Sequence, residues 1–307
     1  MIYIFIINPV AGGKDRSENI RKFLSRKDNF QYLVFDTDGP GQERALVEKM
    51  LVLFEDDVVR FFICGGSGTF FNAFSGVRDM SKVEMAMFPC GATNDFLKIF
   101  GRSRKHYYNM DNLVRGDTLA LDYLKMDNYN ATIFISAGIT ARIEKFVQHI
   151  RFLLSINFRV TYIIAFFATF FSNQSIAYQV DIDGEDLSGE YGMVYIGNGI
   201  VMGGFYCPFK DALPNDGMME VLLLKKISKL KFIHFMRLFQ HGEIEKFDDS
   251  VVIRKAKKIT MKRKDEKDIV LNCDGDLICQ NKVQCELVER GMNFVVPRGA
   301  ELYQSMD

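Results

Sequence analysis

The stretch that most constrains the fold is residues 61–74, where four apolar residues run into a glycine-rich turn and then into a second apolar run. The turn is Gly65–Thr69, with Phe61–Cys64 before it and Phe70–Phe74 after it. A strand, a tight turn and a helix N-terminus together bind anions, because the first N–H groups of a helix have no internal partner and its dipole favours negative charge. An ordinary βα turn can have the same sequence, so this turn alone does not establish a phosphate site.

Three other segments place an apolar strand before a loop of small or polar residues. Ile2–Ile7 leads into Asn8–Lys14, Met85–Phe88 leads into Pro89–Phe96, and residues 269–273 lead into 274–276. Open α/β sheets bind ligands at the carboxyl ends of their strands. Three such ends within the first hundred residues, two of them glycine-rich, predict one shared phosphate-binding crevice.

Residues 1–122 alternate strand-like and helix-like segments, which predicts a parallel sheet covered by helices on both faces. The strands lack polar alternation, as expected for a sheet that is buried on both sides. Strands are expected at 2–7, 31–35, 58–64 and 83–88, and helices at 16–26, 43–54 and 70–76.

After residue 122 the pattern changes to short strands with polar turns, which predicts an antiparallel, sandwich-like β domain. One helical region is expected at 141–172, and the charge-rich segment 255–267 is read as a solvated hairpin, with a basic membrane contact as the alternative. Strands are expected at 122–126, 131–136, 175–182, 192–196, 219–225, 258–262, 269–272 and 282–287.

The charge balance limits the partners of the chain. Lys+Arg and Asp+Glu number 39 each, so no overall field favours nucleic acid, and we expect no nucleic-acid partner. The six cysteines form no C-x-x-C pair. We expect reduced thiols in a cytoplasmic protein, with Cys64, Cys90 and Cys273 buried at strand ends, in preference to disulfides or a zinc site.

Two apolar segments resemble membrane signals. Residues 1–7 lack the basic start of a secretory signal. Residues 152–171 are rich in aromatic side chains but contain Arg159, which disfavours a transmembrane helix. We expect no transmembrane segment, and a shallow membrane contact of residues 152–171 stays open.

Five segments, in this order along the chain, resemble bacterial lipid kinases of the diacylglycerol kinase catalytic family, which is related to sphingosine kinases and more distantly to NAD kinases and phosphofructokinases. The resemblance implies an α/β N-terminal domain with an NAD kinase/phosphofructokinase-like parallel sheet at 1–122, to which 291–307 return. It implies a mainly antiparallel β-sandwich domain for the lipid at 123–290. The segments are Asn8–Gly13, Gly65–Thr69, Pro89–Phe96, Pro208–Gly217 and Asp274–Asp276.

The resemblance implies ATP as the phosphoryl donor and Mg²⁺ as the cation, because phosphoryl transfer needs a phosphate cradle, a divalent cation and a base. Asn8 could instead cap the turn before Pro9, and Asp95 could be an N-terminal helix residue. The residues implied to line the nucleotide are Asn8, Thr37, Gly65, Gly66, Ser67, Gly68, Thr69, Thr93, Asn94 and Asp95.

The catalytic assignment by resemblance falls on Asp274-Gly275-Asp276, which corresponds to the family's Asp-Gly-Glu. A carboxylate there is the general base for the lipid hydroxyl, so Asp276 and Asp274 are the catalytic candidates. Asp276 is one methylene shorter than the family's glutamate, and general-base geometry is sensitive to distance. The alternative reading is a type I′ hairpin turn, for which Asp-Gly is a strong signal.

The resemblance also implies a structural magnesium in the loop 208–217, held by the Asp216 side chain and the carbonyl oxygens of Leu213 and Met218. Oxygen-only coordination suits magnesium. Asp122, at the domain junction, resembles a member of the family's acidic network.

Two positions depart from the family pattern. Ser67 replaces the aspartate of Gly-Gly-Asp-Gly-Thr, and Ala92 and Thr93 stand in exchanged order. The first hypothesis is a lipid kinase that acts on diacylglycerol or a similar lipid at the membrane surface. The alternatives are a relative that binds nucleotide or lipid without transfer, or an NAD kinase-like enzyme. Peripheral membrane association and a homodimer stay open.

Overall fold

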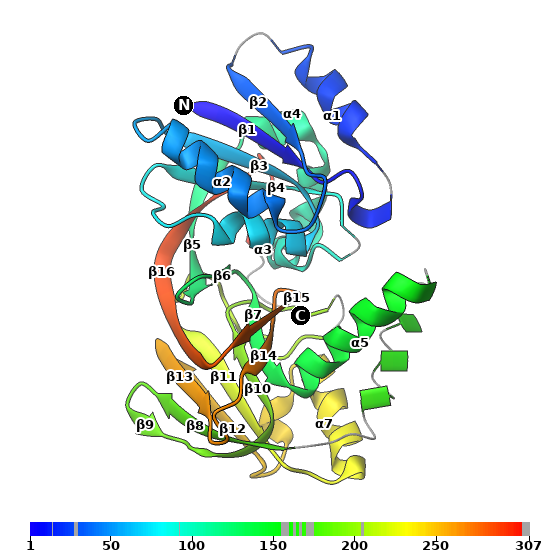
Figure 1. The fold of residues 1–307 in the computed structure, drawn as a ribbon, viewed down its shortest axis with the longest axis vertical. Coiled ribbons are helices and arrows are strands. Elements are labelled where there is room, and N and C mark those ends of the chain that lie inside the picture. Colours follow the sequence, from blue (N-terminus) through cyan, green and yellow to red (C-terminus); the bar gives the residue numbers. More distant parts are fainter. Residues whose placement is uncertain are drawn as a thin grey trace. The chain divides into compact units, whose positions relative to one another are not determined.

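The computed structural model describes residues 1–13, 15–27, 30–91, 93–154, 160–161, 164–165, 168–169, 175–203 and 206–302. The chain divides into two compact units (Figure 1). Unit 1 comprises Met1–Tyr123, Asn128–Asn130 and Glu289–Asp307, and unit 2 comprises Leu124–Asp127 and Ala131–Val288.

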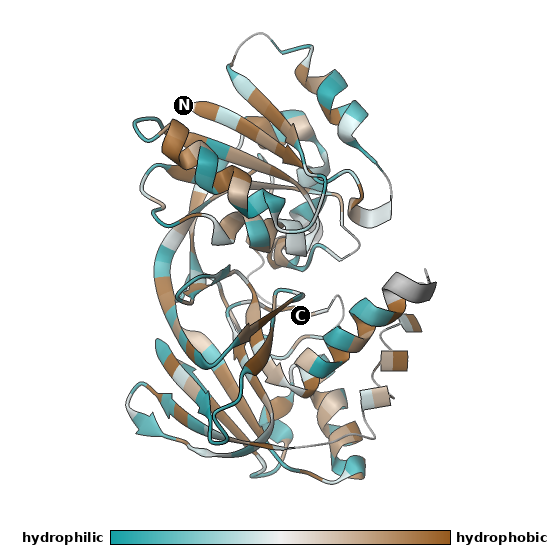
Figure 2. Cartoon of the chain, in the orientation of Figure 1, coloured by the Kyte–Doolittle hydropathy of each residue, from teal (hydrophilic) through white to brown (hydrophobic). Residues whose placement is uncertain are grey.

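Unit 1 is built on a parallel sheet with the strand order β4-β3-β1-β2. The strands are β1 (Ile2–Ile7), β2 (Tyr32–Asp36), β3 (Val59–Gly65) and β4 (Val83–Pro89). Every residue of β3 is buried, and Figure 2 shows β1 and β3 largely brown. The end of β16 (Lys282–Val296) joins this sheet, where Phe294 pairs in parallel with Met85 of β4.

Helices cover both faces of this sheet. The β1-to-β2 and β2-to-β3 connections run in opposite directions, so right-handed crossovers place α1 and α2 on opposite faces. Figure 1 shows α2 and α3 in front of the strands. The helical segments are η1 (Ala11–Gly13), α1 (Ser17–Leu24), α2 (Gln42–Leu53), α3 (Ser67–Ser75), η2 (Asp95–Tyr108) and α4 (Met110–Val114).

The described pairings between the strands of unit 2 are antiparallel. The strands run in the order β15-β14-β7-β10-β8-β13-β16, and β11 and β12 extend from β10. Its strands include β7 (Phe134–Gly138), β8 (Ile176–Ile182), β10 (Gly189–Gly197), β11 (Met219–Lys225), β12 (Val251–Ala256), β13 (Lys258–Arg263), β14 (Ile269–Cys273) and β15 (Asp276–Gln280).

The remaining elements of the described chain are further strands and helices. They are β5 (Asp117–Lys125), β6 (Asn130–Ala131), β9 (Glu185–Asp186), α5 (Ile139–Leu154), α7 (Lys229–His241) and η3 (Ile244–Lys246).

The predicted fold class is confirmed: an α/β unit with a parallel sheet and an antiparallel β unit. The predicted helix 70–76 begins earlier, at Ser67, because Gly66 is extended and ends the strand directly. Of the predicted helix 141–172, α5 ends at Leu154, and most of residues 155–172 lie outside the described part of the chain. The segment 255–267 contains the end of β12 as well as β13, and α7 was not predicted.

The six cysteines are all free thiols, and Cys64, Cys90 and Cys273 are buried as predicted. Burial raises the pKa of Cys64 and Cys273 well above the ordinary thiol range, so both are neutral packing groups. Within the described residues, no helix has the length and apolar character needed to cross a bilayer.

Candidate functional site

The turn between β3 and α3 leaves a helix N-terminus open. Gly66 is the N-cap of α3 with extended backbone, and no side chain caps this end of the helix. The first N–H groups of α3 therefore lack a side-chain acceptor and are available to an anion. Gly65 is required by packing, since a Cβ there would lie 2.4 Å from the Cβ of Thr69.

The loops after β1, β3 and β4 are in contact, as the sequence predicted for a shared site. Asn8 Nδ2 donates to Thr69 Oγ1 at 3.0 Å, and the N–H of Gly91 donates to the Gly65 carbonyl at 3.2 Å. A Cβ on Gly91 would lie 2.4 Å from Gly66 Cα, so the two loops touch through bare backbone. Glycine at these positions is therefore demanded by the close approach of two chain segments.

Asn8 caps the turn after β1, as the alternative interpretation predicted, and its side chain also contacts the start of α3. Its Oδ1 accepts from the N–H of Val10 at 3.2 Å, which is the expected turn cap, while its Nδ2 reaches Thr69. Thr37, which follows β2, is buried, and its N–H donates to the Ile7 carbonyl at 2.9 Å. Both side chains lie at carboxyl ends of the parallel strands, where α/β sheets bind ligands.

The loop after β4 is closed by Asn94. Its Oδ1 accepts from the N–H of Gly91 at 3.1 Å and its Nδ2 donates to the Gly91 carbonyl at 2.9 Å, with Asn94 itself at φ 46°. Asparagine tolerates this left-handed backbone better than most residues. Thr93, beside it, is half-buried. Ala92, whose order with Thr93 differs from the family pattern, lies outside the described residues.

Ser67 is held against the loop after β4. The N–H of Asp95 donates to Ser67 Oγ at 3.3 Å, and the buried Asp95 carboxylate pairs with Lys98 Nζ at 2.6 Å. Asp95 is also the first residue of η2, so the helix-start interpretation holds as well. The contact between Asp95 and the first residue of α3 is therefore made by the backbone of Asp95, while its carboxylate pairs with Lys98.

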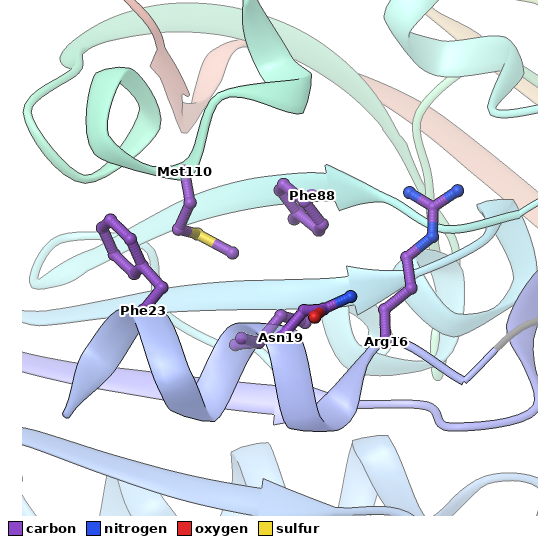
Figure 3. Close-up of a pocket in the computed structure, with 6 residues that line it drawn as sticks. Arg16, Asn19, Phe23, Phe88 and Met110 are labelled. Atoms are coloured by element: carbon purple, nitrogen blue, oxygen red, sulfur yellow. The ribbon is translucent and has the colours of Figure 1, made fainter.

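A cavity of about 280 Å³ opens on the α1 face of unit 1. Figure 3 shows Phe23, Phe88 and Met110 around its apolar part, and Arg16 at the other end. Arg16 Nη1 donates to the Pro89 carbonyl at 3.2 Å, which ties the start of α1 to the end of β4. Asn19 and Ile20 complete the lining.

In unit 2, Asp274 is an anchor for three consecutive backbone N–H groups. Its carboxylate accepts from the N–H groups of Thr132, Ile133 and Phe134 at 2.6, 2.9 and 2.9 Å, and from Thr132 Oγ1 at 2.8 Å. Burial raises the pKa of Asp274, and these hydrogen bonds oppose the rise. Four donors engage both carboxylate oxygens, so this arrangement gives Asp274 a structural role beside its predicted catalytic one.

The Asp274-Gly275 pair forms the turn of the β14–β15 hairpin. Both residues have positive φ, 51° and 100°, as a type I′ turn requires. The hairpin interpretation is therefore correct, and it is compatible with a catalytic role for the next residue. Asp276 is the first residue of β15, half-buried and paired with Cys273.

The loop predicted to hold magnesium brings two carboxylates to one lysine. Lys255 Nζ lies 3.3 Å from Asp216 Oδ2 and 3.5 Å from Glu220 Oε1. Glu220 is 4% exposed, its Oε2 has no hydrogen-bond partner among the described residues, and burial raises its pKa to about 7. Asp216 Oδ1 accepts from the N–H of Met218 at 3.1 Å, while Leu213 is half-buried.

Asp122 has a backbone partner. It is fully buried in β5, and its Oδ1 accepts from the N–H of Arg290 at 2.7 Å, where β16 takes a positive φ of 48°. Within the part of the chain that the structure describes, no three His, Cys, Asp or Glu side chains gather as metal ligands. Asp122 thus braces β16, and its predicted membership of an acidic network stays a prediction.

Four residues of these clusters were not predicted from the sequence. They are Thr132, Lys98, Glu220 and Lys255. Lys98 follows Asp95 by three residues, a spacing that could have been read as a helical ion pair. The other three depend on partners distant in the sequence, and no local pattern marks them.

Comparison with known proteins covers both units. Residues 3–126 match the diacylglycerol kinase catalytic domain, and residues 133–296 match the YegS C-terminal NAD kinase beta sandwich-like domain. Proteins of Staphylococcus aureus strains JH9 and N315, each named "putative lipid kinase", are 27% identical over 176 residues. That alignment spans 57% of this chain and 57% of each relative.

Solved structures with a similar fold come from Bacillus anthracis strain Sterne. A crystal structure titled as a "putative diacylglycerol kinase" has a TM-score of 0.73 and 18% identity, covering 96% of this chain and 97% of that one. A second, titled as a diacylglycerol kinase, has a TM-score of 0.67 and 17% identity, covering 97% and 98%. At these identities the likeness shows the fold alone.

Proposed function

The chain belongs to the bacterial lipid kinase family of the diacylglycerol kinase catalytic domain, and from this we propose that it transfers the γ-phosphoryl group of ATP to the hydroxyl of diacylglycerol or a similar lipid. The observation that carries the proposal is the uncapped N-terminus of α3, against which the loops after β1 and β4 are packed. Such an arrangement suits a polyphosphate.

In this proposal the chain's own groups divide the work. The first N–H groups of α3 bind phosphate oxygens, and Asn8 and Asn94 hold the neighbouring loops in place. The Asp276 carboxylate takes the proton of the acceptor hydroxyl, and Asp274 fixes the turn that presents it. The proposed phosphate-binding loop belongs to unit 1 and the proposed base to unit 2.

Next to the loop of Asp216, a buried Glu220 oxygen has no hydrogen-bond partner among the described residues, which supports a cation there. Such a cation would replace Lys255 as the partner of Asp216. Asp216, with the Leu213 and Met218 carbonyls, would hold the structural Mg²⁺. Asp95 is the candidate carboxylate near the nucleotide. An Mg²⁺ ion bound at the nucleotide would neutralise the charge that develops on the phosphates.

The direct test offers purified protein ATP and Mg²⁺ with a panel of diacylglycerol, monoacylglycerol and sphingosine in mixed micelles, and NAD in a separate reaction. Mass spectrometry of the products should show a phosphorylated lipid. Phosphorylated NAD without any lipid product would support the soluble-substrate alternative. The absence of every product would contradict the proposal.

A second candidate function, binding without transfer, is favoured by one observation. Ser67 carries no charge and its hydroxyl accepts from the Asp95 N–H, so the family's aspartate has no replacement at this position. Ser67→Asp separates the two: a large gain in lipid phosphorylation would favour an impaired site, whereas robust activity of the wild type would exclude it. ATP affinity, measured by calorimetry on both proteins, controls for damage to the loop.

A further inference from the structure

The exposed face of α7 combines apolar side chains with cations. Residues 225–237, which comprise the end of β11, a short connection and most of α7, contain four lysines and one arginine and no acidic residue. Leu230 and Ile233 project from the same helix with 81% and 54% of their surface exposed. We name this surface the α7 face, defined by Lys226, Lys229, Leu230, Ile233 and Arg237.

The helical period places these residues together. Positions 230, 233 and 237 follow the i, i+3, i+7 spacing of one helix face, and Lys229 borders it. All five residues of the α7 face are exposed. Lys226 and Arg237 have no ion-pair partner among the described residues, while Lys231, on another side, pairs with Asp248 at 2.6 Å.

The opposite side of α7 is fixed firmly to unit 2. Phe232, Phe235 and Phe239 are buried, and the Phe239 ring lies 5.7 Å from that of Tyr195. Ser228 caps the helix by accepting from the Lys231 N–H, and Gly242 ends it with φ 64°. Leu230 and Ile233 are therefore not part of the core. They are exposed on a helix (α7, yellow in Figure 1) that its other side holds in place.

We propose that the α7 face docks unit 2 on an anionic bilayer surface. Apolar side chains on a helix enter the boundary between headgroups and acyl chains, while flanking lysines and arginines reach anionic phosphates. The charge selects this occupant, because the three cations of the face, Lys226, Lys229 and Arg237, are complementary to anionic lipid and repel a second copy of the same face. The inference deepens the proposed function, since a lipid kinase must reach an acceptor held in a membrane.

The test measures co-sedimentation of the full chain with vesicles of phosphatidylcholine containing about one-third phosphatidylglycerol, against vesicles of phosphatidylcholine alone. We expect binding to the anionic vesicles that falls when salt shortens the screening length. Lys226→Gln/Lys229→Gln/Arg237→Gln should weaken it at least about tenfold, because each cation near an anionic surface contributes to affinity. Leu230→Asn/Ile233→Asn should also weaken binding, with less dependence on salt.

Two matched controls locate the effect. Val52→Asn/Leu53→Asn removes an equally exposed apolar pair on α2, 77% and 63% exposed and followed by acidic residues 55–57, and should leave binding unchanged. Lys262→Gln/Lys264→Gln/Lys267→Gln removes three cations of the same unit from the segment 255–267. A loss of binding in that variant, and not in the α7-face variants, would assign the membrane contact to the hairpin and overturn the proposal.

The remaining outcomes also decide. Equal binding by wild type and α7-face variants, with unchanged melting temperature, overturns the proposal. Light scattering can overturn it as well. If the wild type is a dimer and the Leu230→Asn/Ile233→Asn variant is a monomer, the α7 face contacts a second copy of the chain. Vesicle binding is measured without ATP, so its result does not depend on whether the protein has kinase activity. As a control, the variants should phosphorylate a lipid dispersed in detergent micelles at the wild-type rate. This result confirms that the substitutions affect docking alone.

Discussion

The two turns that carry the candidate chemistry use glycine and charge in opposite ways. In the Gly65–Thr69 turn of unit 1, a Cβ on Gly65 would meet the Thr69 side chain and one on Gly66 would approach the Gly91 backbone. The helix end offers N–H groups without a side-chain cap. In the 274–276 turn of unit 2, Gly275 is needed for its positive φ, and two aspartates flank it. The first turn presents uncapped N–H groups, and the second contains two carboxylates.

The two turns are held in place by different interactions. The unit 1 turn depends on steric fit between three loops, so an added methyl group should damage it. The unit 2 turn depends on a buried carboxylate that satisfies four donors, so loss of the acid should damage it. Substitutions can show whether packing or hydrogen bonding contributes more to the stability of each turn.

The largest expected effect is on the unit 2 turn. Asp274→Ala leaves the buried N–H groups of Thr132, Ile133 and Phe134 without their acceptor and should lower the free energy of unfolding by about 3–5 kcal/mol. Urea denaturation followed by circular dichroism measures the loss. Asp183→Ala is the matched control, because Asp183 also has a positive φ and accepts from two backbone N–H groups, but at an exposed position. Equal losses would contradict the importance of burial.

A smaller effect is expected from adding a methyl group to the unit 1 loops. Gly91→Ala would place a Cβ 2.4 Å from Gly66 Cα, and the loops must separate at a cost of about 1–3 kcal/mol in unfolding free energy. The variant should also bind ATP more weakly by calorimetry. In Gly39→Ala the new Cβ meets only a side-chain atom at 3.9 Å, so stability and affinity should hold. Unchanged ATP affinity in Gly91→Ala would show that the contact between the two loops does not contribute to nucleotide binding.

The smallest effect concerns the hydrogen bond between the loop after β1 and the start of α3. Asn8 Nδ2 and Thr69 Oγ1, 3.0 Å apart, should be coupled by about 0.5–1.5 kcal/mol in a double-mutant cycle of Asn8→Ala and Thr69→Val. Urea denaturation of the four proteins gives the coupling. A value near zero would mean that the unit 1 turn relies on packing alone, which would sharpen the contrast with the unit 2 turn.

Much of the fold could be predicted because its signals are local. Each parallel strand of unit 1 is a continuous apolar run ended by a turn, and the Asp274-Gly275 pair gives the hairpin directly. The contact between the loops after β1, β3 and β4 followed from the rule that parallel strands end at one edge. The start of α3 at Ser67 was placed too late, because glycines at a helix end were read as turn alone.

The rest depends on partners distant in sequence. Asp274 and Thr132 are 142 residues apart, and nothing near either position indicates the contact. Lys255 meets Glu220 only because β11 and β12 pair, and β12 itself was not predicted. The helix α7 was not predicted because its apolar and polar residues do not follow a clear helical period. Leu230 and Ile233 are apolar but exposed, and three cations lie among the apolar residues.

The most direct measurement compares lipid phosphorylation by the wild type, Asp276→Asn and Asp276→Glu at equal ATP occupancy, with calorimetry confirming that ATP affinity is unchanged. If Asp276 is the base, Asp276→Asn should be slower by about 10²–10⁴ with intact stability, and Asp276→Glu should retain activity. Transfer by Asp276→Asn at the wild-type rate would contradict the assignment of the acid to the unit 2 turn.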